Sequence, residues 1–365
     1  MILQPPKLMK AAQVKHYGDI DEMVSVEDSV IVPSLEDELI IKEKISPAFK
    51  SIIKKDRETH MIIKTLAVSL APGDNRVLSG RTRYLQGPPS LPYVPGGDCC
   101  GVVVDPGNST YFHKGDVVAA RFTVAPRRAM AEYASVSSSV CEKVDTKKIT
   151  PEEAAALASA SPAVVLSERI RPNERVLILG AGGGVGSHLC QLARMKGASY
   201  ICGLSREPQR LLDAPLSCDD AIDYTQENIY ESKKYQQEPF DTIIDLACGG
   251  WPQLVENRRH KLPSIVKPAS QGGRYITITS DTPYFDASSF FHIIGIFLLK
   301  PLRRYILSRL FTRKSLPTFT SVMDCLPETR DVMTKTMNLA NEGKLQAVID
   351  GPYPMDTAHG LFTRN

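Results

Sequence analysis

The spacing of hydrophobic residues changes near residue 150 and predicts two structurally different parts of the chain. Before that point, apolar residues alternate with polar ones or form short buried runs, and turn residues separate the runs. These runs predict strands at residues 9–17, 36–45, 61–70, 98–105, 117–120 and 130–136. The stretch 71–97 is rich in turn residues and predicts loops. Many short strands with frequent turns indicate a small β-barrel.

After residue 150 the pattern favours helices that alternate with strands. Thr150 is a predicted N-cap, Pro151 suits the first helical position, and Glu152 and Glu153 favour the positive end of a helix. Strands are then predicted at residues 176–180, 199–204, 221–224, 240–246 and 273–279, with a helix at 327–343 and a strand at 345–349. Strands that alternate with helices indicate a doubly wound parallel sheet.

A glycine-rich turn between a predicted strand and a predicted helix carries the most specific motif of this region. The turn reads Ala-x-Gly-x-x-Gly over residues 181–186, which is the dinucleotide-binding fingerprint with alanine in place of its first glycine. In such a turn one glycine lets the backbone approach a pyrophosphate, and the last lets helix and strand pack closely, while the helix N-terminus offers free N–H groups. We expect Gly183, Gly184, Val185 and Gly186 to bind a nucleotide, with a plain structural turn as the alternative.

The end of the second predicted strand of this region bears on the choice of nucleotide. Sites for NAD place Asp or Glu here, where the carboxylate accepts hydrogen bonds from the ribose 2′-hydroxyl. This chain has Ser205 and Arg206 instead, with Arg210 one helical turn further on, and these groups suit a 2′-phosphate. Glu207 could serve NAD if the loop turned inward, but beside Pro208 it is a better start for the next helix. We therefore expect NADPH as the cofactor.

Length and composition narrow the class of protein. A length of 365 residues favours two domains, and a net charge of +3 gives no reason to expect nucleic acid as a partner. The eight cysteines include no Cys-x-x-Cys pair, which indicates reduced thiols in an intracellular protein. The N-terminal residues lack the pattern of a signal or transit peptide, so we expect the cytoplasm, with an organelle as the alternative.

Six motifs in order along the chain resemble the medium-chain dehydrogenase/reductase superfamily, and within it the zinc-free quinone-oxidoreductase branch. They are Ser69–Asp74, Pro95–Gly101, Lys114–Asp116, Ala131–Tyr133, Pro151–Ala156 and the glycine turn at 180–186. The resemblance implies an α/β fold in which a GroES-like β-barrel domain, residues 1–150 completed by 316–365, precedes a Rossmann domain with a doubly wound parallel sheet at 151–315. It also implies a homodimer that reduces a quinone, or the C=C bond of an α,β-unsaturated carbonyl, with NADPH.

The sequence departs from the superfamily at the positions that hold zinc in other members. Zinc-dependent members place a cysteine at the position of Ala71, a histidine at Gly97 and a glutamate at Asp98. Tetrahedral zinc needs three or four converging ligands, and neighbours such as Cys99 and Cys100 point to opposite faces of a strand. We therefore expect no metal.

Hydride transfer without zinc needs hydrogen-bond donors and a source of protons. Tyr84, in the loop 71–97, is the candidate proton donor, with an ordinary surface or interdomain contact as its alternative role. The resemblance places Ser161 near the nicotinamide, where it keeps the hydroxyl of the family's threonine, and Tyr224 near the 2′-phosphate. An NADPH-binding regulatory or scaffold protein with weak catalysis is the alternative function, because Ala71 replaces the loop asparagine and the sequence lacks the family's last strand.

A basic and apolar segment near the end of the predicted Rossmann domain suggests a further partner. Residues 287–323 contain no acidic residue and six basic ones. Leu299, Leu302, Ile306 and Leu310 recur at three- and four-residue spacing, so a helix here would carry an apolar stripe. One interpretation is a peripheral membrane contact through residues 290–314, because basic amphipathic helices bind anionic lipid surfaces. The alternative is that the stripe packs against the Rossmann domain or lines the substrate cleft.

Overall fold

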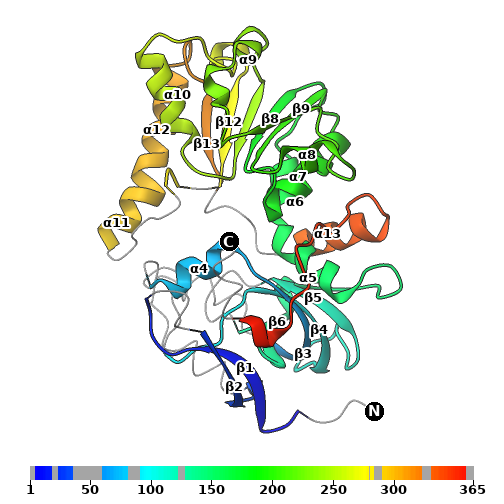
Figure 1. The fold of residues 1–365 in the computed structure, drawn as a ribbon. Coiled ribbons are helices and arrows are strands. Elements are labelled where there is room, and N and C mark those ends of the chain that lie inside the picture. Colours follow the sequence, from blue (N-terminus) through cyan, green and yellow to red (C-terminus); the bar gives the residue numbers. More distant parts are fainter. Residues whose placement is uncertain are drawn as a thin grey trace. The chain divides into compact units, whose positions relative to one another are not determined.

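The computed structural model describes residues 5–18, 24–35, 60–80, 91–121, 128–278, 280–282, 290–322 and 330–358. The chain forms two compact units (Figure 1). The first combines Met1–Ser161 with Glu328–Asn365, and the second is Pro162–Pro327. The domain boundaries expected from the sequence, at residues 150 and 315, stay predictions.

The first unit is built on an antiparallel sheet with strand order β6-β3-β4-β5-β7, and β1 pairs with β2 in a separate two-stranded sheet. Its strands are β1 (Leu8–Val14), β2 (Val24–Ile31), β3 (His60–Ser69), β4 (Asp98–Asp105), β5 (Val117–Arg121), β6 (Tyr133–Ser137) and β7 (Cys141–Lys143). Its helices are α4 (Pro72–Leu78), α5 (Pro151–Ala160) and α13 (Arg330–Asn341). The predicted N-cap of α5 is confirmed, because the Thr150 hydroxyl accepts a hydrogen bond from the Glu153 N–H and the Glu153 carboxylate accepts one from the Thr150 N–H.

The second unit is a six-stranded parallel sheet with the order β10-β9-β8-β11-β12-β13. Its strands are β8 (Arg175–Leu179), β9 (Tyr200–Ser205), β10 (Asp220–Asp223), β11 (Thr242–Asp245), β12 (Arg274–Thr277) and β13 (Thr318–Ser321). The helices are α6 (Pro162–Ser167), α7 (Gly184–Met195), α8 (Pro208–Leu212), α9 (Lys233–Gln237), α10 (Gly250–Arg259), α11 (Phe290–Ile294) and α12 (Lys300–Leu310), and a π-helical turn (Gly295–Leu299) joins the last two. The sheet order reverses its direction at β8, as a doubly wound sheet requires.

Aromatic packing holds helix α10 on the parallel sheet. Trp251 makes edge-to-face contacts with Tyr275 of β12 and Phe319 of β13, at ring-centroid distances of 5.3 and 4.8 Å. The rings of Tyr275 and Phe319 stack on each other at 5.9 Å. All three side chains are buried, so they supply much of the apolar area that this unit removes from water.

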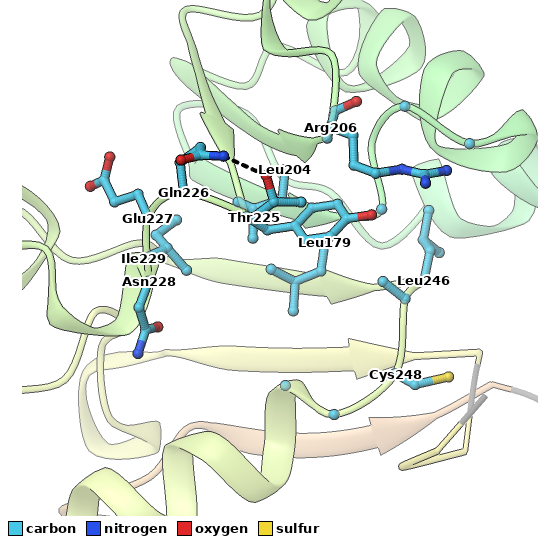
Figure 2. A pocket seen from close by; sticks show the side chains of 18 of the residues that line it. Leu179, Leu204, Arg206, Thr225, Gln226, Glu227, Asn228, Ile229, Leu246 and Cys248 are labelled. Carbon is cyan, nitrogen blue, oxygen red and sulfur yellow. Dashed lines mark hydrogen bonds between the residues drawn. The ribbon is translucent and has the colours of Figure 1, made fainter. Parts of the chain in front are cut away.

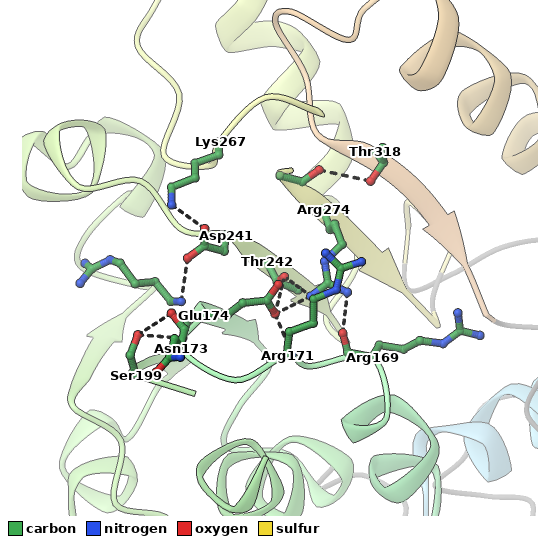
Figure 3. A network of polar contacts seen from close by, with 12 residues as sticks. Arg169, Arg171, Asn173, Glu174, Ser199, Asp241, Thr242, Lys267, Arg274 and Thr318 are labelled. Carbon is green, nitrogen blue, oxygen red and sulfur yellow. Dashed lines mark hydrogen bonds and ion pairs between the residues drawn. The ribbon is translucent and has the colours of Figure 1, made fainter. Parts of the chain in front are cut away.

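A polar network joins the strands at the edge of the parallel sheet where β8, β11 and β12 begin (Figure 3). The Arg274 guanidinium donates to the Glu174 carboxylate and, at 2.8 Å, to the Thr242 hydroxyl. Asp241 accepts a hydrogen bond of 2.9 Å from the Arg175 N–H and one of 2.5 Å from the Lys267 ammonium. Glu174 and Arg274 are both largely buried, so each charge depends on the other for its stabilisation.

The fold class predicted from the sequence is confirmed, a GroES-like β domain with a Rossmann-type parallel sheet. Two details are wrong. Residues 345–349 form no strand, and helix α4 lies in the stretch 71–97 that was expected to hold only loops. Strand β2 was not predicted, while the strand expected at 36–45 lies outside the described residues.

Most cysteines of the described chain are buried. Cys248 alone among them is half-buried, and the other six are Cys99, Cys100, Cys141, Cys190, Cys202 and Cys218. Burial raises the pKa of Cys100 and of Cys202 to about 12. These thiols therefore act as small apolar side chains of the core.

Candidate nucleotide-binding site

A pocket of about 950 Å³ lies in the second unit, where β8, β9, β10 and β11 end. Figure 2 shows Leu179, Leu204, Arg206 and Leu246 around this pocket. The residues that line it directly follow or terminate the four strands. In open α/β sheets, ligands bind at this carboxyl edge, near the strand at which the order reverses. The pocket is therefore at the position that the glycine turn predicts.

The glycine turn has open space at one glycine, where a ligand could approach the backbone. At another glycine it is too tightly packed to accommodate a side chain. A Cβ atom on Gly186 would lie 2.2 Å from the Gly180 carbonyl oxygen and 2.7 Å from Ala181 Cα, so helix α7 and strand β8 pack against each other here. By contrast, nothing lies within 4 Å of a Cβ atom on Gly184. Gly183 and Gly184 are exposed, and Gly183 lines the pocket, whereas Gly184, Val185 and Gly186 form the first turn of α7 behind it.

The start of α7 has the features of an anion site. Gly183 is its N-cap and has no side chain to accept hydrogen bonds from the first N–H groups, and the first turn contains no acidic residue. Those N–H groups carry the positive end of the helix dipole. A phosphate placed against Gly183 would accept hydrogen bonds from them.

The residues after β9 place two cations at the rim of the pocket. Arg206 and Arg210 are exposed and both line it, while Ser205 is buried and its hydroxyl oxygen accepts a 3.0 Å hydrogen bond from the Glu207 N–H. Glu207 precedes α8 as its N-cap, and its carboxylate lies 4.0 Å from the Arg210 guanidinium. Both side chains of that ion pair are well exposed, so it holds Arg210 only weakly.

The third side of the pocket follows β10 and includes a residue that the sequence did not indicate. Tyr224 lines the pocket and is half exposed. Tyr230 also lines it, but its hydroxyl is buried and has no hydrogen-bond partner in the described part of the chain. A buried hydroxyl without a partner is costly, and a ligand that reaches it would remove that cost. The sequence shows no spacing signal for Tyr230, since it depends on the path of the loop after β10.

The fourth side is the loop between β11 and α10, which the buried carboxylate of Asp245 holds in place. Asp245 accepts hydrogen bonds from the N–H groups of Ala247, Cys248 and Gly250, at 2.9 to 3.1 Å, and from the Tyr275 hydroxyl. Burial raises the pKa of this carboxyl, and the four hydrogen bonds act in the opposite direction. Asp245 is the last residue of the buried strand β11, so the same strand-end argument that selected Arg206 could have found it.

Several predicted site residues belong to the first unit. Ser161 ends α5, is buried, and accepts a 3.2 Å hydrogen bond from the Arg121 guanidinium. Ala71 precedes α4, and its N–H donates to the Asp74 carboxylate at 3.0 Å. Cys99 and Cys100 are buried neighbours on β4. Tyr84 lies outside the described residues.

Comparison with known proteins assigns the first unit to a family. Residues 57–155 match the alcohol dehydrogenase GroES-like domain. The chain is 30% identical over 286 residues to a chloroplastic NADPH-dependent alkenal/one oxidoreductase from Arabidopsis thaliana, an alignment that covers 75% of this chain and 63% of that protein. It is 28% identical over 281 residues to the human quinone oxidoreductase, with coverage of 75% and 74%. The first unit therefore carries an alcohol dehydrogenase GroES-like domain, and the chain is similar to members of the medium-chain dehydrogenase/reductase superfamily.

Solved structures are similar in fold to nearly the whole chain. A quinone oxidoreductase from Coxiella burnetii superposes with a TM-score of 0.68 at 19% identity, over 98% of this chain and 95% of that one. At this identity the match concerns the fold alone. The predicted resemblance to the quinone-oxidoreductase branch is confirmed. The chain spans less than two thirds of the length of the plant alkenal/one oxidoreductase.

Proposed function

We propose that this chain is an NADPH-dependent oxidoreductase that reduces a quinone, or the C=C bond of an α,β-unsaturated carbonyl, without zinc. The observation that carries the proposal is the pocket at the carboxyl edge of the parallel sheet, with a glycine turn on one side and two arginines on its rim. The activities for which the plant and human relatives are named, NADPH-dependent alkenal/one oxidoreductase and quinone oxidoreductase, support the same reaction class. The expected homodimer stays a prediction.

The residues of the pocket fit NADPH group by group. The N–H groups at the start of α7 would hold the pyrophosphate, because a side chain is absent at Gly183 and Gly184. Arg206 and Arg210 would bind the ribose 2′-phosphate through charge-assisted hydrogen bonds, with Tyr224 beside them. Tyr230 would contact the bound nucleotide through the part of its side chain that lines the pocket, since its hydroxyl is buried. When bound, NADPH would supply a hydride from its nicotinamide ring.

The first unit supports a reaction that does not depend on zinc. Ala71 and Gly97 offer no metal ligand. Within the described ranges, no group of three His, Cys, Asp or Glu residues could hold a metal ion. A proton donor must then serve the reduced substrate, and Tyr84 remains the proposed residue, with the Ser161 hydroxyl proposed to lie near the nicotinamide.

Substitution of Arg206 tests the cofactor assignment. We expect Arg206→Ala to weaken NADPH binding by about 10- to 100-fold, the value of a lost charge-assisted contact, and to change NADH binding little. Arg259→Ala is the matched control, because Arg259 is an exposed arginine on α10 that does not line the pocket. Fluorescence titration of both nucleotides measures the effect. An equal loss of NADPH and NADH affinity would contradict the assignment.

Turnover with added acceptors tests the reaction. We expect the purified chain to oxidise NADPH when a benzoquinone or a conjugated enone is added, and metal analysis to find no stoichiometric zinc. Binding of NADPH that is never consumed, with any quinone or enone tested, would favour the alternative of a nucleotide-binding regulatory or scaffold protein. A chain that binds no NADPH overturns both readings.

A further inference from the structure

The helical run from Phe290 to Leu310 exposes apolar side chains on one face. Leu299, Leu302, Ile306 and Leu310 have 57%, 48%, 42% and 70% of their surface exposed. Their spacing of three and four residues places them on a single face of α12 and the π-helical turn before it. The body of the protein therefore covers these four side chains only in part, and much of the stripe is exposed.

The opposite face of α12, which contacts the protein, is polar. Ser308 is fully buried, and its hydroxyl oxygen accepts a 3.0 Å hydrogen bond from the Phe319 N–H of β13. The Arg304 guanidinium forms a bidentate ion pair with the Asp281 carboxylate, at 2.6 and 2.7 Å. A surface helix of a globular protein usually buries its apolar face and exposes its polar one. In α12 this arrangement is reversed. An exposed apolar stripe of this kind indicates a surface that contacts another apolar environment.

Unpaired positive charge surrounds the stripe. Lys300 and Arg304 are neutralised by Asp281. Arg303, which shares the exposed face with Leu302, has no ion-pair partner among the described residues, and neither have Arg313 and Lys314 after the helix. No acidic residue occurs from 287 to 323, so this segment itself contributes only positive charge to the surface.

A small cavity next to this segment adds more cations. It has a volume of about 290 Å³ and is lined by Arg258, Lys261 and Lys314, together with hydroxyl groups of Ser264 and Ser315. No carboxylate lines it, and none pairs with these three cations in the part of the chain that the structure describes. Lys314 joins the cavity to the end of the basic segment. Ammonium and guanidinium groups in one cavity are suited to a phosphate group, whereas the hydroxyls of Ser264 and Ser315 already donate to the carbonyl oxygens of Val266 and Thr312.

We propose that this surface docks the protein on an anionic phospholipid membrane. The docking surface comprises the stripe Leu299, Leu302, Ile306 and Leu310 and the cations Arg303, Arg313 and Lys314, with the cavity of Arg258 and Lys261 beside them. The apolar side chains enter the boundary between headgroups and acyl chains, and the cations bind the phosphate groups. The inference does not depend on the proposed enzymatic activity.

The charge distribution favours a lipid surface over a second copy of the chain. A symmetric dimer through this face would bring the same unpaired cations of both copies together, without carboxylates to neutralise them. An anionic membrane supplies the opposite charge and the apolar phase at once. In the residues that the structure describes, no helix has the length and apolar character needed to cross a bilayer, so the contact inferred is with the membrane surface.

Flotation of the full chain with vesicles tests the proposal. We expect the chain to float with vesicles of phosphatidylcholine that contain phosphatidylserine, to float poorly with pure phosphatidylcholine, and to detach as the salt concentration rises. Inorganic phosphate should displace the chain from the vesicles no better than chloride does at the same ionic strength. Absence of flotation with the anionic vesicles at low salt would overturn the proposal.

Two variants locate the surface. The triple change Arg303→Gln, Arg313→Gln and Lys314→Gln should weaken partitioning into anionic vesicles about 100-fold, since each basic residue near the membrane contributes about a factor of five. Its control is Lys114→Gln, Lys147→Gln and Lys233→Gln, which removes the same charge from exposed positions elsewhere. A second triple change, Leu302→Ser, Ile306→Ser and Leu310→Ser, should abolish flotation and lower thermal stability only slightly, because these side chains are 48%, 42% and 70% exposed.

Two outcomes of this series contradict the proposal. Equal weakening by the control lysines would mean that only net charge matters. A dimer in solution that the serine variant dissociates would mean that a second copy covers the stripe. NADPH titration of every variant keeps the two proposals separate, because we expect nucleotide binding to be unchanged in all of them.

Discussion

Gly186 offers the sharpest test of how the nucleotide pocket is built. A methyl group at this position would lie 2.2 Å from the Gly180 carbonyl oxygen, and 2.7 and 2.9 Å from Cα and the carbonyl carbon of Ala181. All three are backbone atoms, so no side-chain rotation can relieve the overlap. Ordinary contact begins near 3.4 Å, and α7 must therefore move away from β8 by about 1 Å.

The expected cost of Gly186→Ala follows from that overlap. Forcing an extra methyl group into a well-packed site costs about 1–3 kcal/mol. For a unit of this size, about 2 kcal/mol corresponds to a fall in Tm of roughly 4–8 °C. Gly184→Ala is the matched control, because it lies in the same helical turn and a Cβ atom there would contact nothing within 4 Å. Alanine is the better helix former, so the control should be neutral or stabilised by up to about 1 kcal/mol.

Urea and thermal unfolding of the two variants, each without nucleotide, measure this difference. The Gly186→Ala chain should unfold at lower urea concentration and lower temperature than both the control and the wild type. If both variants unfold together with the wild type, the close approach of α7 to β8 at Gly186 is not a constraint on the fold, and the reasoning fails.

Three further predictions follow from contacts described above. Glu174→Gln should lower the free energy of unfolding by about 3–5 kcal/mol, because it leaves the Arg274 charge buried without its partner; a double change of Glu174→Leu and Arg274→Met should recover much of that loss in urea unfolding. Tyr230→Phe should stabilise the nucleotide-free chain by about 1 kcal/mol in urea unfolding, since it removes a buried hydroxyl without a partner among the described residues, and should change NADPH affinity little; a destabilised variant would contradict this. Burial raises the pKa of Asp281, but hydrogen bonds from Arg304 and Lys300 outweigh it and hold that pKa below its usual value, so the ion pairs stabilise the fold above about pH 4 and are lost as the pH falls through the folded-state pKa. The Tm of Asp281→Asn should therefore be lower than that of the wild type at neutral pH, and the difference in Tm should shrink as the pH falls. A difference in Tm that does not depend on pH would contradict this.

The sequence predicted those elements whose signals are local. The apolar run at 98–105 forms β4 at the same residues, and Thr150 with Pro151 starts α5 as expected. The glycine turn is also a local signal, because its spacing predicts a strand, a tight turn and a helix, and β8 and α7 lie on either side of it.

The failures depend on contacts between distant residues. The sequence predicts a strand at residues 345–349, but the structure assigns none there, because a strand is defined by regular pairing with a neighbour that local sequence does not specify. Helix α4 begins with Pro72 and has Asp74 in its first turn, both local signals for a helix start, but the prolines and glycines around it favour loops. Tyr230 reaches the pocket only through the course of the loop after β10, which no local pattern specifies.

The buried thiols bear on how the protein withstands its proposed substrates. Quinones and enones are electrophiles that alkylate thiolates, not protonated thiols. With pKa values raised by burial to about 12, Cys100 and Cys202 stay protonated in the cell and do not react. Cys248 lines the nucleotide pocket and is the one described thiol with appreciable exposure. Among the described thiols, alkylation by such a substrate would therefore begin at Cys248, and NADPH bound as proposed would cover that side chain, so that the protein would be most vulnerable when NADPH runs out.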